Sequence, residues 1–536
     1  MGLRVSNLRR PVEEPEAELP RHLAHALGIP PADLGPWRIV RKALDLRDKS
    51  HLRFVYNFEV EAPATLKPNR NRHEAVVEVH DEPPFAMPEP GEQRLEQRPI
   101  VVGSGPGGLV CAYFLARHGY RPLLLERGAR VNVRIRDVER FDAGGPFHPE
   151  SNYLFGEGGA GTFSDGKLTC RGAGPDVLRV LELFAECKGQ QPGKPSILYY
   201  HRPHLGSNRL PAVVKAIRRK IEEFGGEVRF LTRVEDLHFD NAGIRGVATS
   251  SGFIPASVVV LAIGHSARDT FTMLARRQVP MSRKAFQFGV RVEHPQELVN
   301  AVQFGSRHAQ YEEQLGNADY SLIARGRHDL FTFCMCAGGH VIPSVSQAGF
   351  FGTNGMSLSR RDSPFANSGL VATISIEAFE GSDVLAGVRL QERYEKKAFE
   401  LGRGEYRVPI QRATDFLSQR GSAASSPIPS SYPRGQAACD LREILPPLVA
   451  DAVREGLPLM NDRWRGKFLP EAVLVGPESR GSSPVRIDRD GLTRESPGVP
   501  GLYPVGEGAG YAGGIVSAAV DGLRTARAII GKYATA

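Results

Sequence analysis

The chain has 536 residues, a length that predicts two or three domains with a large core. A hydrophobic content of 41% and a charged content of 24% are typical of a globular protein and exclude a disordered chain. The net charge of +8 comes from basic residues interspersed with acids, with no block of five or more. This distribution favours a diffuse basic surface, so no nucleic-acid partner is expected.

Six cysteines are too few for a disulfide framework, and only Cys334 and Cys336 stand near each other. Their usage indicates a reducing compartment, so we expect a cytoplasmic protein. No apolar run approaches the ~18 residues of a membrane span, and no apolar segment follows the charged N-terminus as in a secretory signal. We therefore expect no membrane partner.

Residues 1–95 are predicted to form a small α/β module followed by a linker. A short helix is predicted at Arg21–Leu27, where Pro20 suits a helix start and Gly28 a helix end. Three segments have the pattern of strands: Leu3–Leu8, Trp37–Leu44 and Leu52–Glu61. The stretch Ala62–Gln97, rich in Pro, Glu and Asn, is interpreted as a linker or an irregular arm.

A glycine fingerprint follows the short apolar strand Pro99–Val102, and its residues are Gly103, Gly105, Pro106, Gly107 and Gly108. The first glycine permits a sharp turn, the second lets the backbone approach a pyrophosphate, and the last allows the helix to pack closely on the strand. The helix that begins at Pro106 points free N–H groups and its positive dipole end at the phosphates.

A second predicted strand, Arg121–Glu126, ends in an acid. A carboxylate at this position accepts hydrogen bonds from the adenosine ribose and repels a 2′-phosphate, which argues against NADP. Strand, turn, helix and strand fit within Arg98–Glu126, close to the ~30 residues of a βαβ unit. We therefore predict a dinucleotide-binding Rossmann unit, with Glu126 and the adjacent Arg127 at the cofactor.

The C-terminal segment Gly501–Ser517 resembles the distal flavin motif of two-dinucleotide-binding flavoproteins, with Gly506, Glu507, Gly513, Gly514 and Ile515 at the matching positions. The resemblance implies that the acid holds the ribityl chain and that the next helix starts at the isoalloxazine ring. A helix N-terminus stabilises the negative charge of a reduced flavin. The resemblance therefore selects FAD, bound without a covalent bond, over NAD.

Two further segments support the same kind of protein. Leu261–Asp269 resembles the A-x-G strand end that such flavoproteins carry near the dinucleotide, with Ala262 and Gly264 at the cofactor. Val234, with Arg233, stands where these proteins contact adenine through the backbone.

Long segments in the middle of the chain carry a wider resemblance: Phe155–Leu168, Pro203–Ser207, Phe333–Pro343, Thr353–Ser357 and Phe365–Ser368. They resemble a family of bacterial FAD-dependent dehydrogenases of largely unassigned role, over nearly the whole chain. This chain has Cys336-Ala-Gly-Gly where the resemblance leads us to expect Cys-Pro-Gly-Gly, which changes the local backbone rigidity. A more distant resemblance is to geranylgeranyl reductases and other single-Rossmann flavoenzymes.

The wider resemblance implies that Gly158–Leu168 lines the flavin. Its glycines allow close contact with the cofactor, and its polar side chains can form hydrogen bonds with the pyrophosphate or the edge of the ring. The residues assigned to the cofactor here are Gly159, Ala160, Gly161, Ser164, Asp165, Lys167 and Leu168.

These patterns predict an α/β fold: a discontinuous, glutathione-reductase-like Rossmann domain for FAD from residues 96–275 and 485–536, with a β-rich α+β substrate domain at 276–484. The amphipathic pattern predicts a helix at Pro211–Phe224, followed by strands at Val228–Leu231, Val234–Phe239, Ile244–Thr249 and Ser257–Ala262. In the substrate domain, strands are predicted at Phe286–Val292, Phe331–Cys336 and Leu370–Ile376, helices at Asp383–Glu400 and Leu441–Glu455, and a long surface loop at Ser418–Gln436.

Candidate catalytic residues are His340, Cys336 and Asn354. His340 follows two glycines and titrates near neutrality, which suits proton transfer. Alternation in a strand would place Cys334 and Cys336 on one face, but a disulfide across C-x-C is strained, which favours core packing or substrate lining. Asn354 and Asn367 suit a substrate carbonyl, and no residue spacing indicates a metal site.

The predicted function is a FAD-dependent oxidoreductase, a dehydrogenase or reductase, that transfers hydride between flavin and a small organic molecule. The letters G-x-G-x-x-G recur at Gly156–Gly161 and Gly508–Gly513 without the strand and acid of a second Rossmann unit. Electrons therefore come from a transiently bound NAD(P)H, from the substrate, or from an electron-donor protein. Two alternatives remain open: an oxidase or monooxygenase that uses O2, and an RNA-associated flavoprotein.

Overall fold

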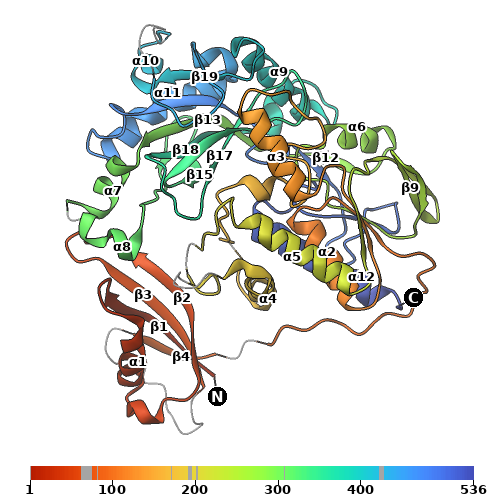
Figure 1. Cartoon of the computed structure of the whole chain (residues 1–536), viewed down its shortest axis with the longest axis horizontal. Helices are drawn as coiled ribbons and strands as arrows, with labels where there is room; N and C mark the ends of the chain where they lie inside the picture. The colour runs from red at the N-terminus through yellow and green to blue at the C-terminus, as the bar shows by residue number, and fades with distance from the viewer. Residues whose placement is uncertain are drawn as a thin grey trace.

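The computed structural model describes residues 2–61, 75–80, 83–170, 172–190, 196–200, 203–306, 308–421 and 428–535. Figure 1 shows a small N-terminal sheet at one end, a large sheet with its helices above it, and a helix-covered sheet beside both. None of the helices in the described ranges combines the length and the hydropathy that a bilayer crossing requires.

The N-terminal module is a four-stranded antiparallel sheet in the order β2-β3-β1-β4, covered by one helix. Its elements are β1 (Gly2–Pro11), α1 (Leu19–Leu27), β2 (Trp37–Asp45), β3 (Arg53–Glu61) and β4 (Val76–Val79). Alternate side chains such as Leu3 and Val5 are buried, and Gly28 ends α1 in a left-handed conformation with φ 73°. The predicted strands and helix are confirmed.

The prediction that Ala62–Gln97 is a linker or an irregular arm is partly wrong, because this segment contains β4. Three valines of β4 give it strand propensity, and it completes the sheet by pairing antiparallel with β1. Residues 62–74 and 81–82 of the predicted linker lie outside the described residues. The rest of the segment runs alongside the C-terminal helix, where the Gly91 N–H donates to the Ile530 carbonyl at 2.8 Å.

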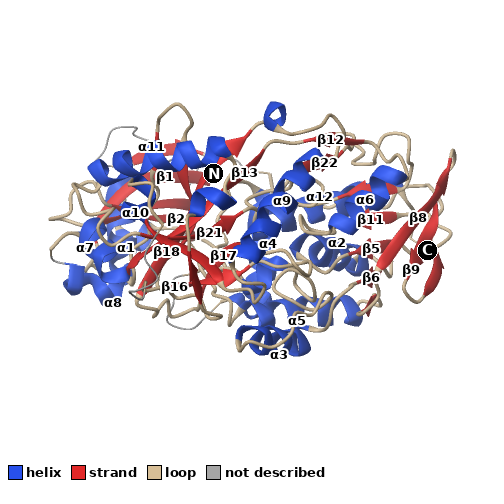
Figure 2. Ribbon diagram, turned by 90° about the horizontal axis from the view of Figure 1, so that it is seen from above, coloured by secondary structure: helices blue, strands red, loops and turns tan. Residues whose placement is uncertain are grey.

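The second sheet has five parallel strands in the order β23-β11-β5-β6-β7, as a Rossmann fold requires. Its strands are β5 (Ile100–Val102), β6 (Leu123–Leu125), β7 (Glu227–Arg229), β11 (Val259–Leu261) and β23 (Leu502–Pro504). One face is covered by α2 (Pro106–Arg117), α5 (Leu210–Glu223) and α12 (Ile515–Lys532). β23, from the C-terminal part of the chain, therefore completes a sheet that starts with β5, and Figure 2 shows β11, β5 and β6 of this sheet side by side.

The opposite face of this sheet is covered by a three-stranded antiparallel meander, β8 (Val234–Asp240), β9 (Gly243–Thr249) and β10 (Gly252–Pro255), and by α6 (Arg268–Arg276). Two helices that the sequence analysis did not predict lie between β6 and α5, namely α3 (Val131–Asp142) and α4 (Pro175–Phe184). The α/β fold class predicted from the sequence is confirmed.

The third sheet has seven strands in the order β14-β15-β18-β13-β21-β19-β20. They are β13 (Phe286–Pro295), β14 (Ile323–Ala324), β15 (Leu330–Cys336), β18 (Phe365–Ile374), β19 (Val408–Arg412), β20 (Gln436–Ala438) and β21 (Val473–Glu478). The accompanying helices are α7 (Gln296–Phe304), α8 (Glu312–Leu315), α9 (Ala386–Leu401), α10 (Ala413–Leu417) and α11 (Pro447–Arg463). A hairpin of β16 (Gly339–Pro343) and β17 (Thr353–Ser357) lies beside it.

The chain enters and leaves this third sheet at one place, where β12 (Met281–Arg283) pairs antiparallel with β22 (Val485–Ile487). The predicted surface loop Ser418–Gln436 is corrected by the structure, apart from residues 422–427, which lie outside the described residues. Ile428 and Tyr432 are buried, and the Ser431 N–H donates to the Glu293 carboxylate at 3.1 Å. Ile428 and Tyr432 therefore contribute to the hydrophobic core of the third sheet.

Candidate cofactor and substrate site

The fingerprint loop has the tight geometry that its glycines require. Gly103 has φ 99°, and a Cβ there would stand 2.4 Å from the Ala262 carbonyl oxygen. A Cβ on Gly108 would stand 1.9 Å from the Gly103 carbonyl oxygen, so this residue must be glycine for α2 to pack on β5. A Cβ on Gly105 would meet nothing within 4 Å, so its side faces open space.

The N-terminus of α2 opens toward that space. Gly105 is its N-cap with extended backbone, and no side chain caps the helix. The first N–H groups of a helix lack internal partners, and they carry the positive end of its dipole. This helix start can therefore bind an anionic pyrophosphate.

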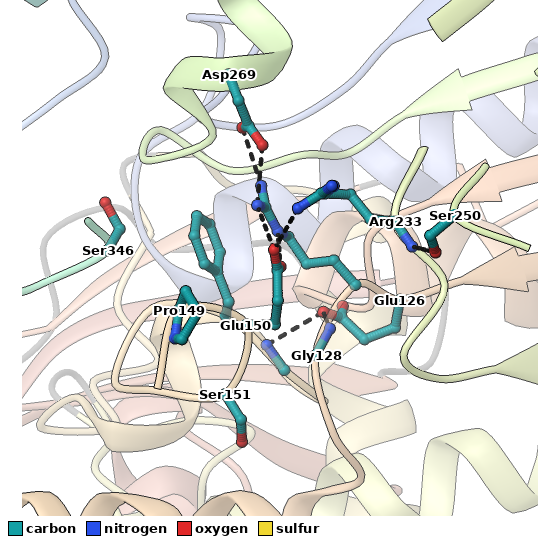
Figure 3. Close-up of polar contacts among 12 residues, drawn as sticks. Glu126, Gly128, Pro149, Glu150, Ser151, Arg233, Ser250, Asp269 and Ser346 are labelled. Atoms are coloured by element: carbon teal, nitrogen blue, oxygen red, sulfur yellow. Dashed lines mark hydrogen bonds and ion pairs between the residues drawn. The ribbon is translucent and has the colours of Figure 1, made fainter. Parts of the chain in front are cut away.

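Glu126 binds the surrounding backbone, while its predicted contact with the adenosine ribose stays a prediction. Its Oε2 accepts hydrogen bonds from the N–H (2.9 Å) and the hydroxyl (2.6 Å) of Ser104, and its Oε1 accepts from the N–H groups of Gly128 (2.8 Å) and Gly156 (3.1 Å). Four donors fill the accepting capacity of one carboxylate, and Figure 3 shows Glu126 turned to the backbone of Gly128. Glu126 thus joins the fingerprint loop to the segment around Gly156.

Arg127 lies in an ion-pair network next to this clamp. Its guanidinium bonds the Glu150 carboxylate (2.6 Å) and the Asp269 carboxylate (2.9 Å), and Arg233 reaches Glu150 from the other side at 2.7 Å (Figure 3). Arg127 also lies 4.1 Å over the ring of Phe155. Val234 begins β8 beside this network and pairs with Thr249.

The glycine-rich segment Gly158–Leu168 crosses the fingerprint. The Gly158 N–H donates to the Ser104 carbonyl at 3.0 Å, and a Cβ on Gly159 would stand 3.1 Å from the Cα of Gly105. A Cβ on Gly161 would stand 3.3 Å from Ile515 and 3.5 Å from Pro106. Gly161, with Ala160 in the short 3-10 helix Ala160–Phe163, therefore lies between the starts of α2 and α12.

The C-terminal motif lies directly beside the fingerprint. Gly522 of α12 can approach Gly107 of α2 because a Cβ on it would stand only 2.1 Å from the Gly107 carbonyl oxygen. Gly506 has φ 77° and donates its N–H to Asp521 at 2.8 Å. Gly264 contacts the same motif, since a Cβ on Gly508 would stand 2.5 Å from the Gly264 carbonyl oxygen.

Glu507 is the acid of this motif. Its Oε2 lies 4.0 Å from Nδ1 of His265, and Gly513 and the uncapped N-cap Gly514 of α12 stand next to it in the turn. Burial raises the pKa of Glu507 to about 7, although nearby Lys284 opposes the shift. Burial also lowers the pKa of His265 to about 3, helped by Arg480 and Arg268, so His265 is neutral. Perturbed groups of this kind are characteristic of functional sites.

Asp165 and Lys167 contact residues of the substrate domain. They form an ion pair with each other, Asp165 accepts a hydrogen bond from Ser357, and Arg361 reaches it at 3.3 Å. Burial favours a neutral Asp165, but Lys167 and Arg361 outweigh it and keep its pKa well below the ordinary value. This buried cluster joins the glycine-rich segment to β17.

Two other residues assigned to the cofactor serve the local fold. The Ser164 hydroxyl donates to the Gly161 carbonyl at 2.8 Å, within its own turn. Leu168 is a core side chain with 2% exposure. Neither contact points to the fingerprint, so the flavin-lining role of these two side chains stays a prediction.

The candidate catalytic residues divide into two places. Cys336 and Asn354 lie around the buried Arg291, whose guanidinium contacts the Cys336 Sγ at 3.9 Å and the Asn354 Oδ1 at 3.5 Å. His340 lies on the neighbouring hairpin, half-buried, with its pKa lowered by burial against the effect of Asp362. The structure thus brings Cys336 and Asn354 together but leaves His340 outside this cluster.

Strand alternation does not hold at the two cysteines, so the prediction that both occupy one face through regular alternation is wrong. A register shift interrupts the pairing of β15 with β18 between Phe333 and Cys336, and Cys334 has a positive φ of 46°. An extra residue in one strand reorients the side chains that follow it.

Sequence reasoning missed Arg291 and Glu478. Arg291 is fully buried, pairs with Glu478 at 3.0 Å and bonds the Asn367 Oδ1 at 2.9 Å. Burial raises the pKa of Glu478 to about 7, only partly opposed by Arg291. The sequence does contain a signal for this pair: Arg291 lies inside the predicted apolar strand Phe286–Val292, and a buried charged side chain needs a partner of opposite charge. The described residues hold no group of three or more His, Cys, Asp or Glu side chains placed to bind a metal.

Comparison with known proteins identifies the family. A model of the C-terminal domain of FAD-dependent proteins matches residues 285–481, and a model of the NAD(P)-binding Rossmann-like domain matches residues 101–159. An uncharacterized protein of Clostridium beijerinckii is 38% identical over 537 residues, which cover 99% of each chain. The chain belongs to the FAD-dependent protein family. The N-terminal module, at residues 3–61, matches a domain of unknown function.

Solved structures that resemble this member of the family do so distantly. Glycine oxidase from Bacillus cereus is 12% identical, with 81% of this chain and 95% of that chain covered at a TM-score of 0.34. L-Proline dehydrogenase from P. horikoshii is 13% identical, with 82% and 93% covered at a TM-score of 0.34. A geranylgeranyl bacteriochlorophyll reductase-like protein from Thermoplasma acidophilum is 12% identical, with 82% and 78% covered at 0.36. These likenesses carry no information about the reaction.

The residues present fit the FAD that the family requires. Open space lies beside Gly105, and both α2 and α12 start without a side-chain cap, so two helix starts meet at one glycine-rich segment. A dinucleotide with two separated polar ends matches that arrangement. The half-buried carboxyl of Glu507 lies by the second helix start, where the family resemblance places the ribityl chain.

Proposed function

We propose that the protein is a FAD-dependent oxidoreductase, a dehydrogenase or reductase, that exchanges hydride with a small organic substrate. The observation that carries the proposal is Gly161, which lies between Pro106 of α2 and Ile515 of α12. One segment therefore contacts the starts of both helices, which suits a single extended cofactor. When bound, FAD supplies the two-electron chemistry.

The chain's own residues have separate tasks in this proposal. The start of α2 binds the pyrophosphate through Gly105 and the N–H groups that follow it. The start of α12 stabilises negative charge on the pyrimidine side of the ring. Asn354, in β17, orients a polar substrate group, and the fully buried Arg291 holds Asn354 in place through its Oδ1.

Electron supply is part of the proposal. The described residues contain one five-stranded parallel sheet with one fingerprint, so NADH or NADPH would bind transiently rather than in a second Rossmann unit. A donor protein is the other source. The RNA-associated alternative gains no support from the N-terminal module, where Arg4 and Arg38 pair with Glu59 and Lys42 pairs with Glu16.

The test is an anaerobic titration of the purified protein. We expect a yellow protein that releases FAD on denaturation and whose flavin is bleached by NADH, NADPH or a candidate metabolite. Rapid reoxidation by air with formation of peroxide would instead favour the oxidase alternative. A colourless protein that cannot be reconstituted with FAD would refute the proposal.

A further inference from the structure

A compact group of charged side chains lies where the glycine-rich segment meets the substrate domain. At its centre is the Asp165 carboxylate, which is 1% exposed. Lys167 and Arg361 both contact the same oxygen of that carboxylate, Oδ2, so the two cations are neighbours in space. The other oxygen, Oδ1, accepts a hydrogen bond from the Ser357 hydroxyl and lies 3.3 Å from Nε2 of His204.

This group carries one more positive charge than negative charge. Burial would lower the pKa of Lys167, but the charge of Asp165 outweighs burial and raises that pKa, so Lys167 is charged. Burial would raise the pKa of Asp165, but Lys167 and Arg361 hold it well below its ordinary value. Burial, helped by Arg361, lowers the pKa of His204 against the effect of Asp165, so its ring is neutral. Two cations therefore share one anion.

The accessible part of the group is its positive part. The Lys167 side chain is 24% exposed and that of Arg361 is 17% exposed, whereas the Asp165 side chain is sealed at 1%. The Lys167 ammonium has three N–H groups and uses two of them, on Asp165 and on the Met335 carbonyl. Among the described residues, only Nη2 of the Arg361 guanidinium has an acceptor, and its Nε is buried without one. A ligand that reaches the group therefore meets cationic donors that the protein leaves unused.

The backbone of Arg361 has a conformation that residues other than glycine rarely adopt. Its φ of 54° lies in the left-handed region, in the turn that follows β17. The turn is fixed from both sides, because the Arg361 N–H donates to the Leu358 carbonyl at 3.0 Å and the Arg361 carbonyl accepts from Nδ2 of Asn317 at 2.5 Å. Backbone strain of this kind concentrates at functional sites, and here it fixes the point from which the guanidinium reaches Asp165.

The group lies on the substrate side of the cofactor site. Lys167 follows Gly161, which lies between the starts of α2 and α12, by six residues, and six extended residues span at most about 20 Å. Arg361 and Ser357 belong to the substrate domain. The pyrophosphate, in contrast, is expected at the start of α2 beside Gly105. The anion that suits these two cations is therefore a substrate rather than the phosphates of the cofactor.

We propose that Lys167 and Arg361 bind the carboxylate of the substrate, so that the protein oxidises or reduces a small organic acid. The inference rests on the proposed function, because it names the substrate class of the same site. A carboxylate suits this pair, since the guanidinium donates through N–H groups in a planar fork and the ammonium adds a compact positive charge. Asp165 keeps both cations in place, but it also competes with the ligand for their donors.

The experiment measures the binding of small carboxylates to the FAD-bound protein by calorimetric titration. The probes are acetate, pyruvate, succinate and benzoate, each compared with its uncharged amide. We expect at least one of the four acids to bind about 10-fold or more tightly than its amide, because a charged acceptor forms the stronger hydrogen bonds. Equal affinities for acids and amides, or no binding of any of the four acids, would overturn the inference and leave the proposed function intact.

Three substitutions separate carboxylate binding from a purely structural role. Arg361→Gln and Lys167→Met each remove a cation and should weaken the binding of the acid about 10- to 100-fold, with the affinity for FAD unchanged. Asp165→Asn removes the competing negative charge and should strengthen the binding of the acid. A purely structural group would lose affinity in all three variants. Arg361→Gln leaves the pair of Lys167 and Asp165 intact, so it provides the test if Lys167→Met does not fold.

Arg389→Gln is the matched control, because it removes one positive charge from an exposed pair with Asp383 at 2.9 Å and should leave both affinities unchanged. An Arg361→Gln protein that binds the acid as tightly as wild type, or an Asp165→Asn protein that binds it more weakly, would overturn the inference. Weaker FAD binding by Lys167→Met, with unchanged affinity for the acid, would overturn it by assigning the cations to the cofactor. A protein that cannot bind FAD would overturn the proposed function as well.

Discussion

Replacing Gly105 with alanine should separate cofactor binding from folding. Gly105 has φ −68° and ψ 177°, a conformation that alanine adopts freely, and its new Cβ would meet no protein atom within 4 Å. The apoprotein should therefore be as stable as wild type or more stable by about 0.4–1 kcal/mol, because alanine restricts the unfolded chain.

The substitution should instead weaken the binding of FAD. The methyl group would stand where the pyrophosphate must approach the backbone, so one charge-assisted hydrogen bond worth about 1.5–3 kcal/mol would be lost. At 1.4 kcal/mol for each factor of ten, the dissociation constant of FAD should rise about 10- to 100-fold. Flavin fluorescence titration measures the affinity, and denaturant unfolding of the apoprotein measures the stability.

Two further glycine substitutions serve as controls for Gly105→Ala. Gly491→Ala also meets no atom within 4 Å but lies outside the site, so it should leave the FAD affinity unchanged and affect apoprotein stability to the same small extent as Gly105→Ala. Gly108→Ala would place its Cβ 1.9 Å from the Gly103 carbonyl oxygen, so it should destabilise the apoprotein itself. A folded Gly105→Ala protein that binds FAD with wild-type affinity would refute the reasoning.

Three carboxylates provide further predictions. Glu126→Gln should destabilise the apoprotein by about 1–3 kcal/mol in denaturant unfolding, because the donors at one carboxylate oxygen would face an amide N–H; unchanged stability with weaker FAD binding would show that Glu126 acts through the ribose alone. Burial alone would raise the pKa of Glu395, but Arg268 and Arg480 lower it to about 2. Its stabilising effect should therefore persist above its ordinary pKa of 4.5 and disappear as the pH falls toward 2, and unfolding curves of Glu395→Gln that show the same acid sensitivity as wild type would contradict this. Glu507 has a raised pKa of about 7, so apoprotein stability should decline as the pH rises from 4.5 through 7. Glu507→Gln should remove that decline in the same assay, and a decline that survives the substitution must have another origin.

The sequence by itself was sufficient for the fold class and for the fingerprint, because these depend on neighbours along the chain. Strand, glycine turn, helix and second strand follow one another within Arg98–Glu126, and each is encoded by local periodicity or by a backbone that only glycine adopts. The C-terminal motif was identified by its resemblance to the distal flavin motif of other flavoproteins, which is also carried by residues that are neighbours along the chain. The short strands of the third sheet were largely missed because pairing with distant strands, rather than local pattern, makes them strands.

The roles of individual side chains were decided by the tertiary structure. Glu126 sits at its predicted strand end, but its capacity is filled by Gly156, 30 residues away, which no local pattern could indicate. The bulge at Cys334 exists only in the pairing of β15 with β18. Arg291 meets Glu478 across 187 residues of sequence. Hydrogen-bond capacity and buried charge depend on distance in space, so only the folded chain determines which groups satisfy each other.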